Sequence, residues 1–301
     1  MTNPSVATFA TTASRHINTM NKKLKLTLLL FLFTLSNVYS QTSILPLDLA
    51  KKIFSKTKFT EIKKYCTGEY KGRPNGTDLD VNATLQFTLL GQTDDKAVVG
   101  ITILDKTGKG FDAYLHFSKQ NIWKANAFRA LAMTGMIEGA KKELEQLSLE
   151  AIDSIIAKSK NDTTGNSMFK SREDYDFQLG NLNLILALDS EIIDHFNKNK
   201  IEFERLKDIV FKNLYTIKAD ERGSKKLYNG LENDFHKLFI NSIETGGDEF
   251  GNCIKFSIGG MLDNTVGYLF VKDKKDVPEM NPAGIIMIRE IGNGWYIYKT
   301  T

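Results

Sequence analysis

The stretch IIMIREIGNGWYIYK, residues 285–299, contains the clearest hairpin pattern in the chain. Two runs rich in β-branched and aromatic side chains, Ile285 to Ile291 and Trp295 to Lys299, flank the turn sequence Gly292-Asn-Gly294. Glycine and asparagine adopt the positive φ angles that tight hairpin turns need. The stretch therefore predicts two neighbouring antiparallel strands.

Alternating polarity indicates a further strand. Between residues 111 and 117 apolar side chains alternate with Asp112, Tyr114 and His116, and Gly108-Lys-Gly110 just before them suits a hairpin turn. This alternation predicts one strand face packed on helices and one face left available. Consecutive strands with short turns, preceded by helical patterns, favour an α+β fold over an α/β fold.

A repeated pattern divides the chain into two halves. Three positions recur in the same order, each at a predicted strand: Phe87 with Phe256, Gly100 with Gly267, and Trp123 with Trp295. Chance can supply any one of these matches, but their shared order predicts an internal duplication. We therefore expect two related domains, each with helices packed on a curved antiparallel sheet, in which these residues occupy equivalent strands.

Apolar residues at helical spacing precede the strands of each half, from Leu49 to Cys66 and from Ile192 to Leu214. The predicted divisions are a first α+β domain at 41–135, a helical linker at 136–174 and a second α+β domain at 175–301. Within the second domain, the apolar run 182–188 allows either a strand or the start of a helix, because so short a run has no clear period.

The first 40 residues match a signal peptide. Three lysines precede an apolar run from Leu26 to Leu35, and Val38-Tyr-Ser40 matches a small-residue cleavage site. The run is about half the ~20 residues of a membrane-spanning helix, so no stable membrane anchor is expected. Residues 1–19 form a doubtful extension, because Met20 is the better start. We expect an exported protein, periplasmic or secreted, that begins at Gln41.

The formal net charge of +4 comes from the predicted signal peptide. Four basic residues and no acidic residue precede residue 41, and the remaining Lys and Arg residues balance the 36 Asp and Glu residues. A balanced mature chain indicates no nucleic-acid partner and no attraction to an anionic membrane.

Export permits disulfides, and the chain has two cysteines, Cys66 and Cys253. A disulfide between them would join the two predicted halves. The alternative is a pair of buried free thiols that act as small apolar side chains, and we favour it because this is the more common use of cysteine.

The sequence assigns no catalytic residue, metal site or cofactor. The histidines after residue 41, His116, His195 and His236, lack the HxxxH, CxxC or CxxH spacing of a zinc site. The glycine-rich stretch 246–251 follows a predicted helix and precedes a strand, the reverse of a phosphate-binding loop, and no GxSxG motif occurs. Tyr114 and His116 are the candidate ligand-binding residues because they share the available strand face. A structural role is favoured even for His116, since a lone residue is a weak signal.

The two tryptophans each begin the last strand of a predicted sheet. Side chains of this size gain most from burial between a sheet and its helices. We expect Trp123 and Trp295 to be buried, with Phe196 or Phe203 beside Trp295. The alternative is a pair of exposed platforms for a sugar.

Helices followed by a curved antiparallel sheet, with a closing strand that begins at Trp123 or Trp295, resemble the NTF2-like and cystatin-like superfamily. The stretch from Val266 to Tyr298 is also similar to small exported bacterial proteins. NTF2-like domains include enzymes, ligand binders and interaction modules, so the resemblance implies a fold and carries over no catalytic residue.

Three hypotheses of function follow. The first is an exported non-enzymatic protein that binds a small ligand, a glycan or a protein in its concave faces or between them. The second is an inhibitor or immunity-like partner of another exported protein, which requires a large apolar surface patch. The third, ranked last, is a hydrolase or isomerase with a buried carboxylate assisted by His116 or Tyr114. A polar pocket holding an acid of strongly raised pKa would favour it.

Overall fold

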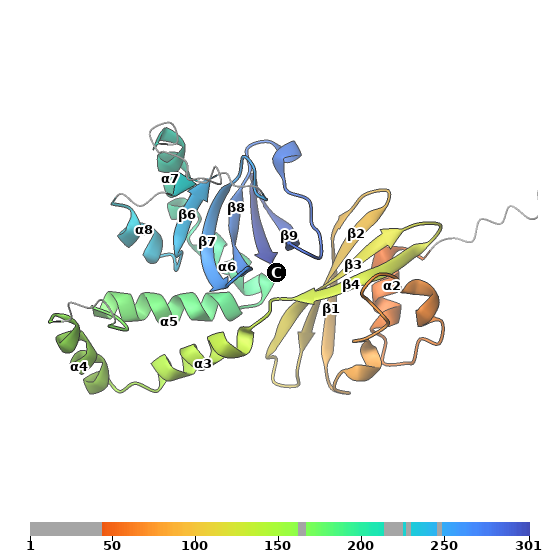
Figure 1. Cartoon of the computed structure of the whole chain (residues 1–301), viewed down its shortest axis with the longest axis horizontal. Coiled ribbons are helices and arrows are strands. Elements are labelled where there is room, and N and C mark those ends of the chain that lie inside the picture. The colour runs from red at the N-terminus through yellow and green to blue at the C-terminus, as the bar shows by residue number, and fades with distance from the viewer. Residues whose placement is uncertain (1–43, 162–166, 214–224, 227–229, 246–248) are drawn as a thin grey trace, which may run out of the picture. The chain divides into compact units, whose positions relative to one another are not determined.

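The computed structural model describes residues 44–161, 167–213, 225–226, 230–245 and 249–301. Residues Leu45 to Thr301 form one compact unit. They fold into an α+β structure with two antiparallel sheets, as the sequence predicts (Figure 1). The predicted signal peptide lies outside the described residues. Among those described, no helix is long and apolar enough to cross a membrane.

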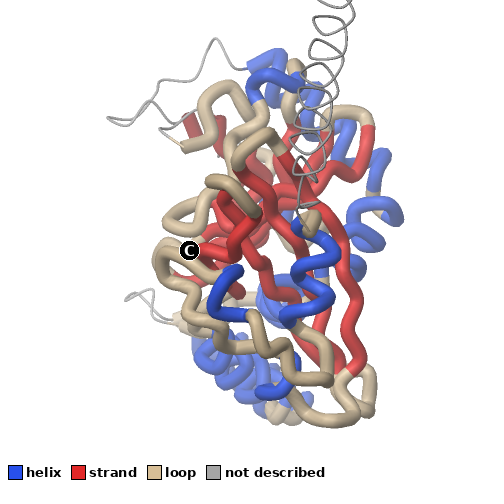
Figure 2. Tube along the Cα trace, turned by 90° about the vertical axis from the view of Figure 1, so that its right-hand side faces the viewer, coloured by secondary structure: helices blue, strands red, loops and turns tan. Residues whose placement is uncertain are grey.

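The first sheet is a meander in which each strand pairs with the next one along the chain. Helix α2 (Pro46–Ile53) packs across its first two strands and buries Leu49, Ala50 and Ile53. This helix layer lies in front of the strands in Figure 2. The strands are β1 (Thr84–Gln92), β2 (Lys96–Leu104), β3 (Gly110–Lys119) and β4 (Trp123–Ala130), and the layer also has the 3-10 helices η1 (Ile62–Tyr65) and η2 (Gly76–Asp78).

Three helices connect the sheets: α3 (Thr134–Glu145), α4 (Leu149–Ser159) and α5 (Arg172–Leu186). The apolar run 182–188 therefore belongs to a helix for most of its length, which resolves the strand-or-helix alternative. Helix α5 packs on α3 and on the second sheet. The predicted division at residues 174 and 175 falls inside the first turn of α5.

The second sheet has the strand order β5-β6-β7-β8-β10-β9. The predicted hairpin at residues 285–299 is confirmed, because β9 and β10 pair antiparallel and Gly292, Asn293 and Gly294 all have positive φ. The strands are β5 (Lys225–Lys226), β6 (Ser242–Thr245), β7 (Ile254–Met261), β8 (Asn264–Phe270), β9 (Ile285–Gly292) and β10 (Trp295–Thr300); the helices are α6 (Asp189–Lys198), α7 (Lys200–Asn213), α8 (Glu232–His236) and η3 (Lys274–Asp276).

The two sheets differ in strand order, which contradicts the predicted equivalence of the two tryptophans. Phe87 and Phe256 do each lie on a strand that pairs with the strand of the matched glycine. Trp123 lies on β4, which β3 separates from the strand of Gly100, whereas the strand of Trp295 pairs directly with that of Gly267. Short turns force sequential neighbours in the first sheet. In the second sheet the connection from residue 271 to 284 is long, so β9 does not have to pair with β8. Strand β10 lies between these two strands and pairs with both.

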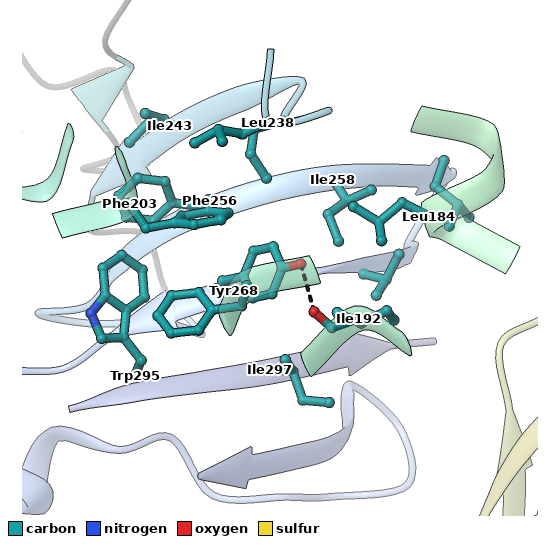
Figure 3. Packing of buried hydrophobic residues seen from close by; sticks show 14 of the residues in the cluster. Leu184, Ile192, Phe203, Leu238, Ile243, Phe256, Ile258, Tyr268, Trp295 and Ile297 are labelled. Atoms are coloured by element: carbon teal, nitrogen blue, oxygen red, sulfur yellow. Dashed lines mark hydrogen bonds between the residues drawn. The ribbon is translucent and has the colours of Figure 1, made fainter. Parts of the chain in front are cut away.

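Trp295 lies at the centre of the second sheet's core and is fully buried. Its ring centroid is 5.0 Å from that of Phe196 and 5.8 Å from that of Phe203, as the sequence predicts. The hydroxyl of Tyr268, in the same core, donates to the carbonyl oxygen of Ile192 at 2.9 Å (Figure 3). Trp123 is also buried. The exposed-platform alternative is therefore wrong for both tryptophans.

Both cysteines are free thiols, so the structure does not contain the alternative disulfide between Cys66 and Cys253. Cys66 donates to the carbonyl oxygen of Ile62 beside the first sheet, at 3.1 Å. Cys253 is buried in an apolar cluster of the second sheet. Burial raises the pKa of both thiols, to about 11 for Cys253.

Candidate functional site

The strand face that carries the predicted ligand-binding residues is closed. Tyr114 is fully buried and His116 is only 3 % exposed. The expectation that this face stays available is wrong, because the second half of the chain packs against it. The polar side chains of the face therefore contact residues of α6, β9 and β10.

Asp112 and Tyr114 join Thr102, Asp189 and Lys299 in a set of polar side chains that we call the junction cluster. The Tyr114 hydroxyl donates to Asp189 Oδ1 at 2.9 Å and lies 3.1 Å from Asp189 Oδ2. Lys299 Nζ lies 2.8 Å from Asp189 Oδ1 and 4.0 Å from Asp112 Oδ2. Asp112 also accepts hydrogen bonds from the Thr102 hydroxyl and from the Asp189 amide.

Rigid elements hold these groups in place. Strand β3 supplies Asp112 and Tyr114, and every residue of β10 up to Lys299 and Thr300 is buried. Asp189 opens α6, where a carboxylate is favoured by the partial positive charge of the helix N-terminus. The cluster thus forms because α6 and β10 converge on the neighbouring strands β2 and β3, from which they are distant in sequence.

Two carboxyl groups share one ammonium group in the junction cluster. Burial, followed by the charge of Asp189, raises the pKa of Asp112, and Lys299 opposes this shift. Burial also raises the pKa of the Tyr114 hydroxyl well above its usual range, so this group stays a donor. The charges are desolvated, which makes their mutual geometry important for stability.

His116 lies on the same face of β3 without joining the cluster. Burial and, to a lesser degree, the nearby Arg129 lower its pKa to about 4. One ring nitrogen bonds the backbone of Ile286, whereas Nε2 has no hydrogen-bond partner among the described residues. His116 is therefore a neutral, packed histidine at neutral pH.

An open cleft lies between α3, α5 and the start of α6, with the β2–β3 turn at one end. Its volume is about 1070 Å³, and we call it the α3–α5 cleft. Leu184, Leu186 and Phe239 contribute apolar surface to it. Charged side chains of both signs also line it: Lys109, Glu138, Lys141, Lys142, Glu145 and Glu191.

Phe239 forms one wall of the α3–α5 cleft in a strained backbone conformation, with φ of 56°. Its ring stacks on His195 at 5.6 Å and lies so close to α5 that a Cβ on Gly180 would come within 2.2 Å of it. The Asn181 side chain donates to the Phe239 carbonyl oxygen at 2.7 Å. Strained residues persist where their surroundings hold them, often at binding sites.

The remaining histidines line cavities although their sequence context is unremarkable. His195 lines the α3–α5 cleft, and its Nε2 bonds the carbonyl oxygen of Leu238 at 3.0 Å. His236 stacks on Phe177 at 4.0 Å beside a second cavity of about 550 Å³. Within the described part of the chain, no three His, Cys, Asp or Glu side chains form a group that could hold a metal ion.

Of the two ligand-binding candidates from the sequence, Tyr114 belongs to the junction cluster and His116 does not, and Lys299 was not predicted as a partner of Asp189. Sequence reasoning also missed the α3–α5 cleft. The one local signal was Gly180, a residue that weakens a helix interior and so indicates a close approach by another group. The partners across the cluster have no sequence signal, because they meet only after folding.

Comparisons with protein-family models, with curated proteins and with solved structures find no match to this chain.

Proposed function

We propose that the chain is an exported, non-enzymatic binding protein whose α3–α5 cleft takes a polypeptide segment. The observation that carries this proposal is the cleft itself, with its size, its apolar wall and its charged lining. Open grooves with an apolar floor and a polar rim are the usual receptors for peptide segments.

The charges favour a peptide over a glycan. Three lysines and three glutamates line the α3–α5 cleft. Lys141 pairs with Glu145 at 3.6 Å, and the Glu191 carboxylate accepts from the Leu188 amide, so part of this charge is already used within the protein. A peptide carries side chains of both signs and can match the rest, whereas a neutral sugar would leave these charges unmatched.

A hydrolase or isomerase that uses Asp112 with Tyr114 is less well supported. Such an enzyme needs an acid of raised pKa and a polar pocket around it, and the raised pKa of Asp112 meets the first of these conditions. However, Asp112, Tyr114, Asp189 and Lys299 are each at most 7 % exposed, and none of them lines the cavities described above. A substrate would have to open the junction between the sheets to reach them.

Peptide selection tests the proposal. The mature protein is panned against a random peptide library displayed on phage, and the enriched peptides are measured by titration. We expect Lys142→Trp, which places a large side chain in the α3–α5 cleft, to weaken their binding at least tenfold. Lys142 is exposed, so this change leaves the core intact.

Gln146→Trp is the matched control, because Gln146 is exposed at the end of the same helix and does not line the cleft. If the enriched peptides bind both variants equally, the proposal that the α3–α5 cleft is the binding site is contradicted. If phage-displayed peptides are enriched no more on this protein than on an unrelated protein, the proposal that the ligand is a peptide is contradicted. If neutral oligosaccharides bind the parent and Gln146→Trp but not Lys142→Trp, the α3–α5 cleft is still the binding site, but its ligand is a glycan and the peptide proposal is contradicted.

A further inference from the structure

The junction cluster places an amine beside a carboxyl group in a dry interior. Within the described part of the chain, Lys299 alone forms ion pairs in which both side chains are less than a tenth exposed. The ring of Tyr114 also lies near this amine, with its centroid 5.8 Å from Nζ. The amine therefore has a carboxyl carbon within contact distance and little water nearby.

We propose that Lys299 and Asp189 condense into an isopeptide bond between Lys299 Nζ and Asp189 Cγ, with Asp112 as the proton carrier. This modification would link β10 covalently to α6. It is independent of the proposed peptide binding, because no member of the junction cluster lines the α3–α5 cleft.

The positions of the groups match the steps of this condensation. Lys299 passes a proton to Asp112, and the Nζ lone pair then attacks Asp189 Cγ. Electrons move onto the Asp189 oxygens, to which the Tyr114 hydroxyl donates at 2.9 and 3.1 Å. A donor held at a developing oxyanion stabilises such an intermediate.

Collapse of the intermediate expels one Asp189 oxygen as water. Two of the three ammonium protons leave with that oxygen, one of them through Asp112, and the third stays on the amide nitrogen. Asp112 returns to its starting state, so the step consumes no co-reactant. Burial raises the pKa of Asp112, which suits a carboxylate that must accept and return a proton.

Two features of the surroundings favour the bond over the ion pair. The ion pair keeps two desolvated charges, which the condensation removes. The reacting groups are held by β10, α6 and β3, so the reaction is intramolecular and benefits from a high effective concentration. Because Asp112 and Tyr114 come from the first sheet, the bond should form only after the two sheets have packed together.

Mass spectrometry of the purified mature protein tests the proposal. The intact mass should be lower than the sequence mass by one water molecule, and proteolysis should yield the peptide of Asp189 joined to the peptide of Lys299. The joined pair distinguishes the bond from loss of water elsewhere. A full sequence mass, with Lys299 acetylated quantitatively after denaturation, would overturn the proposal.

Three variants separate the bond from ordinary packing. Lys299→Arg keeps a cation but should abolish the joined peptides, and Asp112→Asn should reduce them at least tenfold. Asp189→Asn should still give the same joined product, now with loss of ammonia. Circular dichroism establishes that each variant is folded. Joined peptides that persist in Lys299→Arg, or undiminished in folded Asp112→Asn, would contradict the assigned roles.

Discussion

His116 is the residue whose burial makes stability depend most directly on pH. Its pKa falls from the ordinary 6.5 to about 4 in the folded chain, so the unfolded chain takes up a proton first as the pH decreases. Its contribution to the free energy of unfolding is complete above about pH 6.5 and is lost progressively as the pH falls toward 4. The size of this loss is on the order of 3 kcal/mol.

His116→Asn tests this dependence. Asparagine can keep the bond to the Ile286 backbone but has no charge to gain. We expect the decline in unfolding free energy between pH 6.5 and 4 to be smaller in the variant by most of that contribution. Urea titrations at several pH values measure it. Parallel pH profiles for the two proteins would show that His116 does not titrate as described.

Trp295 decides how strongly β10 is anchored to α6 and α7. The side chain is fully buried among four phenylalanines and its Nε1 donates to Glu204 at 2.9 Å. We expect Trp295→Ala to lower the free energy of unfolding by about 3–5 kcal/mol, because the cavity cannot collapse between a sheet and its helices. Trp295→Phe should lower the free energy of unfolding by clearly less than Trp295→Ala does. Differential scanning calorimetry decides, and equal melting temperatures for Trp295→Ala and the parent would refute the structural role.

We expect the substitution of glycine by alanine to have opposite effects on the free energy of unfolding in helices α3 and α5. At Gly139 nothing lies within 4 Å of an added Cβ, so Gly139→Ala should raise the free energy of unfolding by roughly 0.5–1 kcal/mol. At Gly180 the Cβ would meet the Phe239 ring at 2.2 Å. Gly180→Ala should therefore be destabilising by about 1–3 kcal/mol.

The pair is measured by chemical denaturation, with Gly180→Ala/Phe239→Ala as the third variant. In the Phe239→Ala background, Gly180→Ala should lower the free energy of unfolding much less than it does in the parent protein, because the ring that the new Cβ would meet is gone. A stabilising Gly180→Ala would mean that Phe239 does not pack on α5 and that the wall of the α3–α5 cleft lies elsewhere.

At the scale of the whole molecule, an ion pair in the buried junction and an ion pair at the surface each join the first sheet to the second half of the chain. Lys299 contacts Asp112 inside the dry junction, whereas Lys96 of β2 pairs with Glu279 on the surface, where the two side chains are 55 % and 67 % exposed. We expect Lys299→Met to lower the unfolding free energy by about 3–5 kcal/mol, because the variant leaves two carboxyl groups buried without a counter-charge and cannot form the bond to Asp189. Lys96→Met should change it little, since exposed pairs contribute little.

Calorimetry shows whether this junction makes the two sheets unfold together. The parent should unfold in a single transition, in agreement with one compact unit from Leu45 to Thr301. Lys299→Met should unfold in two separate transitions, one for each sheet. A single transition at an unchanged temperature in Lys299→Met would show that other contacts, such as the bond from Arg129 to the Pro282 carbonyl oxygen, carry the coupling.

The sequence by itself determined the fold class, the hairpin at residues 285–299 and the burial of Trp123 and Trp295. These features follow from local turn chemistry and from the size and period of apolar side chains, which act over short stretches. Only the tertiary structure decided the strand order of the second sheet, because a long connection allows more than one neighbour. It also decided that Tyr114 and His116 are buried at a junction and that Asp112, Asp189 and Lys299 meet, since these contacts form between elements whose approach no local pattern specifies.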